Sequence, residues 1–140
     1  MTETLPQQWP RRALLVGVVY LVASIATAQL AATAASNRIQ FFWRLSAFIV
    51  SAVVFAAHIA YEYFRVGNTA RPTALHTSLA VAFGAFLLAL VANIHDLGSA
   101  SGYRPRLLIA LVAWPLLTAV PAFIVALLLA AGLSLTRFRT

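Results

Sequence analysis

The sequence lacks cysteine and lysine altogether and has few charged residues of any kind. The absence of cysteine excludes disulfides, thiolate catalysis and cysteine-ligated zinc sites. Charged residues make up 9% of the 140 residues, whereas soluble domains carry roughly a quarter. Hydrophobic residues make up 62%, which is more apolar surface than a soluble chain of this length can hide. We therefore expect the lipid bilayer to solvate much of the chain.

Acidic residues are also scarce, with three in the whole chain. Outside the N-terminal tail only Glu62 and Asp96 remain, and the topology predicted below puts them at opposite membrane faces. The chain has no GxSxG, Walker A or GxGxxG motif, so acyl transfer, phosphoryl transfer and nucleotide binding have no sequence support. We expect no enzymatic activity and no cofactor.

The cationic residues are ten arginines, which give the chain a net charge of +7. They are spread along the chain in pairs beside apolar runs rather than gathered in one basic patch. This distribution is typical of membrane-flanking anchors that face anionic headgroups. We expect the bilayer, and not nucleic acid, to be the partner of these charges.

Four apolar runs stand out, each longer than the roughly 20 residues that cross about 30 Å of hydrocarbon as a helix. They are rich in alanine and leucine and do not alternate, which favours helices over strands. Short polar links favour antiparallel neighbours. We predict one all-α domain over 1–140, a polytopic membrane protein with an antiparallel bundle of four transmembrane helices over residues 13–35, 41–64, 73–94 and 107–135.

The ends of the runs carry further signals. The first run also resembles a secretory signal, but its length and the three spans after it favour a retained helix. Gly67 and Asn68 are placed to cap the second helix, and Pro72 falls near the first turn of the third. With a cytoplasmic N-terminus, six arginines flank the cytoplasmic side and four the other. We predict a multi-pass protein of the cell inner membrane with both termini cytoplasmic.

The second apolar run carries a polar stripe. Arg44, Ser51, His58 and Arg65 recur every seven residues, and Glu62 lies four residues after His58. Residues at these spacings share one face of a helix. Because charged side chains are costly against lipid, we expect the stripe to face protein.

The depth of each residue in the membrane indicates which residues of the stripe can meet residues of the third helix. If the helix ends at Arg65, Glu62 lies about 5 Å and His58 about 10 Å inside, at about 1.5 Å per residue. The third helix returns from Thr73, which puts His76 about 5 Å inside as well. We predict a cluster of Glu62, His58, His76 and Arg65 near one membrane face.

The cluster has several interpretations. It is either a working site that exchanges protons or binds an ion, or a polar staple between helices. Glu62 with His58 and His76 would also be a nitrogen and oxygen ligand set for a metal, although the segment lacks the HExxH pattern. Haem binding needs two histidines at matched depth, and His58 and His76 are offset by a turn. The metal question stays open at this point.

Two further features are candidates for a role in transport. Asn93 and Asp96 end the third helix, near the membrane face opposite Glu62. Pro115 and Pro121 lie within the fourth apolar run, where each removes a backbone hydrogen bond and tends to bend or break the helix. Broken helices beside polar stripes build substrate sites in transporters, whereas a simple bend is the more frequent outcome.

The sequence favours a small membrane transporter or channel for a proton, an ion or a small solute. Glu62 would titrate or bind the ion, with His58 and His76 as modulators, Arg65 as a gate, and Ser51 further along the stripe. Four helices are few to enclose a pathway, so we expect a homo-oligomer. An accessory or scaffold subunit of a larger membrane complex is the alternative, and a haem- or quinone-handling membrane subunit is the third interpretation.

Overall fold

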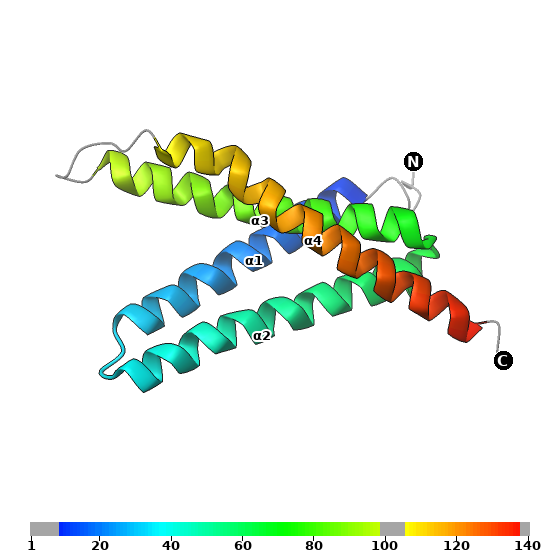
Figure 1. Cartoon of the computed structure of the whole chain (residues 1–140), viewed down its shortest axis with the longest axis horizontal. Coiled ribbons are helices and arrows are strands. Elements are labelled where there is room, and N and C mark those ends of the chain that lie inside the picture. The colour runs from blue at the N-terminus through cyan, green and yellow to red at the C-terminus, as the bar shows by residue number, and fades with distance from the viewer. Residues whose placement is uncertain (1–8, 99–105, 138–140) are drawn as a thin grey trace.

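The computed structural model describes residues 9–98 and 106–137, and within them the regular structure is entirely helical (Figure 1). The helices are α1 (Trp9–Ala32), α2 (Asn37–Tyr61), α3 (Ala70–Leu97) and α4 (Arg106–Arg137), and α2 continues into a π-helical turn, η2 (Glu62–Val66). The four predicted helices are confirmed. Their ends differ from the predicted ones by a few residues, as at the start of α1, which is Trp9 and not Ala13.

All four helices are long and apolar enough to cross a membrane. The shortest, α1, has 24 residues, which corresponds to about 36 Å and exceeds the hydrocarbon thickness of about 30 Å. Large apolar side chains on every helix are exposed, among them Val22, Phe48, Val91 and Leu128, as expected where acyl chains replace water. The chain is a multi-pass membrane protein with a four-helix bundle.

The helices form two antiparallel hairpins that cross each other (Figure 1). α3 lies between α1 and α4 and makes most of the contacts between the hairpins. The start of α1, the turn from α2 to α3 and the end of α4 lie at one end of the molecule, and the turn from α1 to α2 lies at the other (Figure 1). All four helices therefore have a terminus at the end of the molecule that carries Glu62.

The two hairpins meet most closely where glycines of α1 and α3 face each other. A Cβ atom built on Gly84 would lie 3.0 Å from the Tyr20 Cβ and 3.2 Å from the carbonyl oxygen of Gly17. Such close approach of two backbones is available only to very small residues. Small residues of α1 and α3 thus pack against each other within one chain.

A second contact joins α4 to the end of α2. Ile59 and Tyr63 of α2 and η2 are buried with Ala74 of α3 and with Ala126 and Ala130 of α4. The alanines let α4 approach closely, and the larger side chains of α2 fill the space. This small core lies beside Glu62 in the sequence and fixes the end of α2 against α3 and α4.

The turn between α2 and α3 follows the predicted capping chemistry. Gly67 adopts the left-handed conformation with φ of 76° and donates its N–H to the carbonyl oxygen of Glu62. The Asn68 N–H donates to the same oxygen at 3.1 Å. Pro72 falls in the first turn of α3, where its missing N–H costs little. The turn directs the chain back beside Glu62 within three residues.

α4 passes through both of its prolines without interruption. Thr118, between Pro115 and Pro121, donates its hydroxyl to the carbonyl oxygens of Trp114 at 2.9 Å and Pro115 at 3.0 Å. The idea of a helix broken into two half-helices is therefore not supported, because α4 is continuous over its 32 residues.

Substitution at the glycine crossing tests this packing. Gly84→Ala should destabilise the protein by about 1–3 kcal/mol, because a methyl group has no room against Tyr20 and the α1 backbone. Gly132→Ala in α4 is the matched control, since nothing lies within 4 Å of a Cβ at that position. Unfolding of both variants by SDS in bicelles measures the difference. Equal stabilities would contradict the close α1–α3 contact.

Candidate functional site

The most unusual side chain in the membrane-spanning part is Glu62, at the junction of α2 and η2. Its relative exposure is 1%, and it is among the largest fully buried side chains of the described residues. A carboxylate removed from both water and headgroups costs several kcal/mol, at least about 3, unless polar groups compensate it. The neighbours of Glu62 are therefore the first place to look for function.

Three polar side chains surround the carboxylate. His76 Nδ1 lies 2.9 Å from Glu62 Oε2, and the Asn68 amide donates to the same oxygen. His58 Nε2 lies 3.8 Å from the other oxygen, Oε1, which is within ion-pair range but too long for a hydrogen bond. We call these residues, with Trp9, the Glu62 cluster.

Local structure explains how the cluster assembles. His58 precedes Glu62 by four residues, so one turn of α2 brings the two side chains together. The turn at Gly67 returns the chain, and α3 then places His76 beside Glu62 at the depth that the sequence predicts. The cluster therefore joins the end of one hairpin to the start of the other.

Trp9 closes the cluster from α1. Its indole ring stacks on the His76 imidazole with centroids 4.7 Å apart and the ring planes 1° from parallel. One α1 turn away, the Arg12 guanidinium lies over the Tyr61 ring, 5.3 Å from its centroid. The first helix thus covers the side of the cluster that α2 and α3 leave open.

Trp9 and Asn68 were missed by sequence reasoning. The sequence predicts Asn68 as a residue that caps the second helix. It does not predict the hydrogen bond from the Asn68 side chain to Glu62. Trp9 begins the first helix at the same membrane face as Glu62 and His76 under the predicted topology. The similar depths of Trp9 and His76 allow them to meet. The sequence does not indicate, however, that α1 packs against α3 rather than against another helix.

Two buried atoms of the cluster have no hydrogen-bond partner within the described residues: Glu62 Oε1 and His58 Nδ1. Both atoms are buried, so their capacity to form hydrogen bonds is unused in this structure. A groove of about 360 Å³ between α1 and α2 leads to His58; it is lined by Arg12, Leu15, Val16, Val54, Ala57, His58 and Tyr61. The imidazole of His58 therefore lies between this groove and the carboxylate.

The structure does not bring Arg65 into the cluster. Arg65 is exposed. Within the described residues, Glu62 lies within ion-pair distance of the two histidines instead. The prediction assumed α-helical geometry, in which a residue three positions on returns to the same face. A π-helical turn holds more residues, so Arg65 is rotated away from Glu62.

Ser51 also lies apart from Glu62. It is half-buried and precedes His58 by seven residues, or about 10 Å along α2. It lines a groove between the hairpins together with Pro121. The polar stripe therefore has two separate parts.

Of the two residues predicted at the far end of α3, Asn93 contacts the next helix. The buried Asn93 amide donates to the carbonyl oxygens of Ala89 and Leu107, each at 2.8 Å. The second bond ties the end of α3 to the start of α4. Asp96 is half-buried one turn further on, at the end of α3 opposite Glu62. Pro115 lines an apolar groove with Trp9 and Leu111.

The described residues include no group of three histidine, cysteine or acidic side chains arranged to hold a metal ion. His76 is hydrogen-bonded directly to Glu62, and the two histidines contact different oxygens of one carboxylate. The carboxylate therefore has a hydrogen bond to His76 on one oxygen and a longer, ion-pair contact with His58 on the other.

Trp9 offers a direct optical test of the cluster. In a Trp43→Phe/Trp114→Phe variant, the further change His76→Ala should shift Trp9 emission to longer wavelength. The physical reason is that loss of the stacked imidazole leaves one face of the indole uncovered. Steady-state fluorescence in nanodiscs measures the shift.

The control uses a histidine outside the cluster. His95→Ala, at an exposed position near the far end of α3, should leave Trp9 emission unchanged. Identical Trp9 emission in the His76→Ala and His95→Ala variants would show that the stacking does not exist in the membrane.

Comparisons with protein-family models, with curated proteins and with solved structures find no match for this chain. Its function is therefore argued from the geometry of its own residues.

Proposed function

We propose that the chain is a small membrane transporter or channel that moves protons or a small ion through the Glu62 cluster. The observation that supports this proposal is a carboxylate with 1% exposure inside a membrane-spanning segment, flanked by two histidines. Ionisable residues in such segments are rare and concentrate at ion pathways and proton relays. Histidine is the side chain whose charge changes near neutral pH.

The cluster supplies a short relay for protons. His76 Nδ1 exchanges a proton with Glu62 Oε2 across their hydrogen bond. Rotation of the protonated carboxyl group then carries that proton to the side of Oε1, which lies 3.8 Å from His58 Nε2, and a small movement of His58 closes this gap. The His58 ring accepts the proton at Nε2 and releases another from Nδ1, the nitrogen without a partner in the described residues. His58 lines the groove between α1 and α2, so a rotation of its ring passes the released proton to that groove.

The relay spans only one end of the bilayer, so the rest of the pathway needs other groups. Between His76 and Asn93 the buried face of α3 consists mainly of small residues, such as Ala80, Gly84 and Ala89. We propose that subunits of a homo-oligomer complete the path between them. The arginine distribution supports an inner-membrane location with both termini, and hence the Glu62 cluster, on the cytoplasmic side.

One observation favours the alternative of an accessory subunit. The bonds of Glu62 join the end of α2, the turn after it and α3, and Trp9 adds α1. Such an arrangement serves equally as a polar staple that fixes three helix ends. In that role the cluster would stabilise a scaffold and carry no protons.

Flux measurements separate the two roles of Glu62. In proteoliposomes loaded with a pH-sensitive dye, Glu62→Gln should abolish the proton or ion flux driven by a pH gradient, because an amide of the same shape cannot take up a proton at this position. Arg65→Gln is the matched control: it removes a charge three residues away at an exposed position and should leave the flux intact. Equal flux in Glu62→Gln and the unmodified protein would contradict the transport proposal.

The oligomer is tested separately. Native mass spectrometry of protein extracted from its own membrane in mild detergent should show a homo-oligomer, because one chain does not enclose a path. Stable complexes with a different protein would support the accessory role. A monomer alone would contradict the shared pathway.

A further inference from the structure

A groove between α1 and α2 lies toward the opposite end of the molecule from the Glu62 cluster. Its volume is about 340 Å³, within the range of small-molecule sites. Its polar lining consists of Ser24 and Thr27 of α1 and Gln40 and Arg44 of α2, and we call it the Arg44 groove. Arg44 is eighteen residues from Glu62, or about 27 Å along α2, so the two sites are separate.

Arg44 carries a positive charge that no acidic side chain of the groove offsets. Glu62 and Asp96 are the two acidic residues in the part of the chain that the structure describes, and neither lines the groove. Arg44 is exposed, so its guanidinium is open to a ligand from outside the chain. A guanidinium binds carboxylate and phosphate oxygens through several N–H groups at once. The groove therefore favours an anionic ligand.

Gln40 adds a second hydrogen-bond donor beside Arg44. The two residues are four positions apart on α2, so their side chains are neighbours on one face of the helix. Gln40 is half-buried, and its amide supplies N–H groups without a charge. Together the two side chains suit a ligand that carries several oxygen acceptors in one group, as a phosphate does.

The position of Arg44 along α2 indicates the source of such an anion. α2 and η2 together have 30 residues, which corresponds to about 45 Å and exceeds the hydrocarbon thickness by about 15 Å. Arg44 lies seven residues from the first residue of α2, or about 10 Å along the helix. A helix centred in the bilayer therefore places Arg44 close to the boundary of the hydrocarbon. From there its side chain reaches the layer of lipid phosphates.

The rest of the lining suits an acyl chain. Four alanines line the groove, among them Ala28 and Ala47, and their small side chains provide an apolar surface. Ser24 also lines the groove where the two hairpins cross, so the apolar surface continues from Arg44 toward the middle of the bilayer. A phospholipid has the same arrangement, because its phosphate lies at the boundary and its acyl chains are directed inward.

We propose that the Arg44 groove binds an anionic phospholipid through its phosphate diester. Arg44 and Gln40 donate to the phosphate oxygens, and one acyl chain lies over the alanines toward Ser24. Phosphatidylcholine fits less well, because it brings a quaternary ammonium next to Arg44 and the groove has no acidic residue to pair with that group. Inorganic phosphate fits less well, because it has no chain to cover the apolar surface. The site is independent of whether Glu62 relays protons or staples helices.

Native mass spectrometry of the protein in mild detergent tests the proposal by titration with a phospholipid. The first dioleoylphosphatidylglycerol to bind each chain should bind more tightly than dioleoylphosphatidylcholine. Arg44→Gln should weaken the binding of phosphatidylglycerol about fivefold, as expected for one arginine beside an anionic lipid. Ala28→Leu, at an exposed position of α1, should weaken it too, because the larger side chain occupies the space of the acyl chain.

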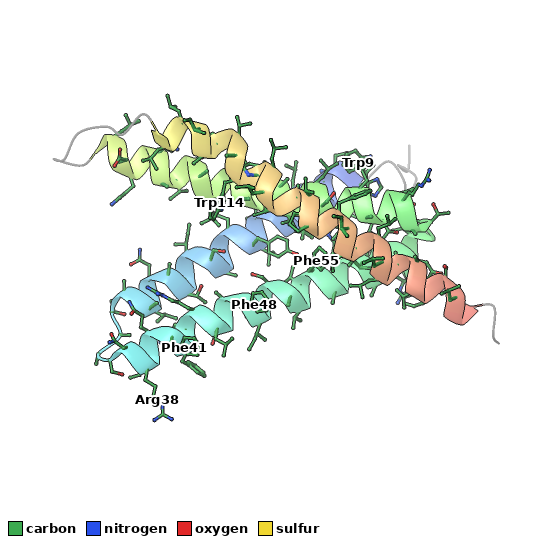
Figure 2. The ribbon with its side chains drawn as sticks, viewed as in Figure 1. Trp9, Arg38, Phe41, Phe48, Phe55 and Trp114 are labelled. Atoms are coloured by element: carbon green, nitrogen blue, oxygen red, sulfur yellow. The ribbon has the colours of Figure 1, made fainter. Side chains whose placement is uncertain are left out.

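Arg38→Gln is the matched control. Arg38 is exposed near the start of the same helix, and Figure 2 shows it pointing away from the helices. Its replacement removes the same charge outside the groove and should leave the affinity for phosphatidylglycerol unchanged. Inorganic phosphate in excess is the second control and should not displace the lipid.

Tighter binding of phosphatidylglycerol that is weakened by Arg44→Gln and Ala28→Leu, but not by Arg38→Gln, supports the proposal. Equal weakening by Arg44→Gln and Arg38→Gln would overturn it, since the lipid would then respond to surface charge alone. Displacement by inorganic phosphate would overturn it as well, because the ligand would then be a free anion. Equal affinities for the two lipids would contradict the preference for an anionic headgroup.

Discussion

The structure depends on how one carboxylate is compensated where the protein covers it almost completely. Glu62 is buried at the end of α2, and polar groups from α2, the following turn and α3 surround it. Burial of a carboxylate costs free energy unless its partners stay in place, because removing one partner of a buried ion pair leaves the other charge uncompensated. The same pairing makes the cluster sensitive to protonation.

The rest of the fold brings these partners together. The glycine contact between α1 and α3 lets the two hairpins cross closely, which places Trp9 over His76. The left-handed Gly67 turns the chain within three residues, so that α3 begins beside the end of α2. At the crossing the four helices also leave a groove that is lined by Tyr20 and Trp114.

The sequence predicts the spans well because their length and apolar character follow from the thickness of the bilayer. It also predicts the meeting of Glu62 with His58 and His76, since helical rise and an antiparallel turn fix their depths. It does not predict the π-helical turn, which rotates Arg65 away from Glu62. Nor does it predict Trp9 on His76 or the groove between hairpins, because these depend on which helix faces pack together. Small residues allow several pairs of helix faces to pack closely, and the sequence alone does not indicate which pair forms.

The central claim is that the Glu62 carboxylate is hydrogen-bonded to His76 and faced by His58 in the bilayer. Solid-state NMR of protein labelled with ¹⁵N-histidine and ¹³C-glutamate in bilayers tests it directly, because it measures the dipolar coupling between a histidine ring nitrogen and a glutamate carboxyl carbon. The account predicts a strong coupling that is lost in His76→Ala and kept in His95→Ala, since His95 lies at an exposed position near the other end of α3. The absence of any strong histidine–glutamate coupling in the unmodified protein would contradict it.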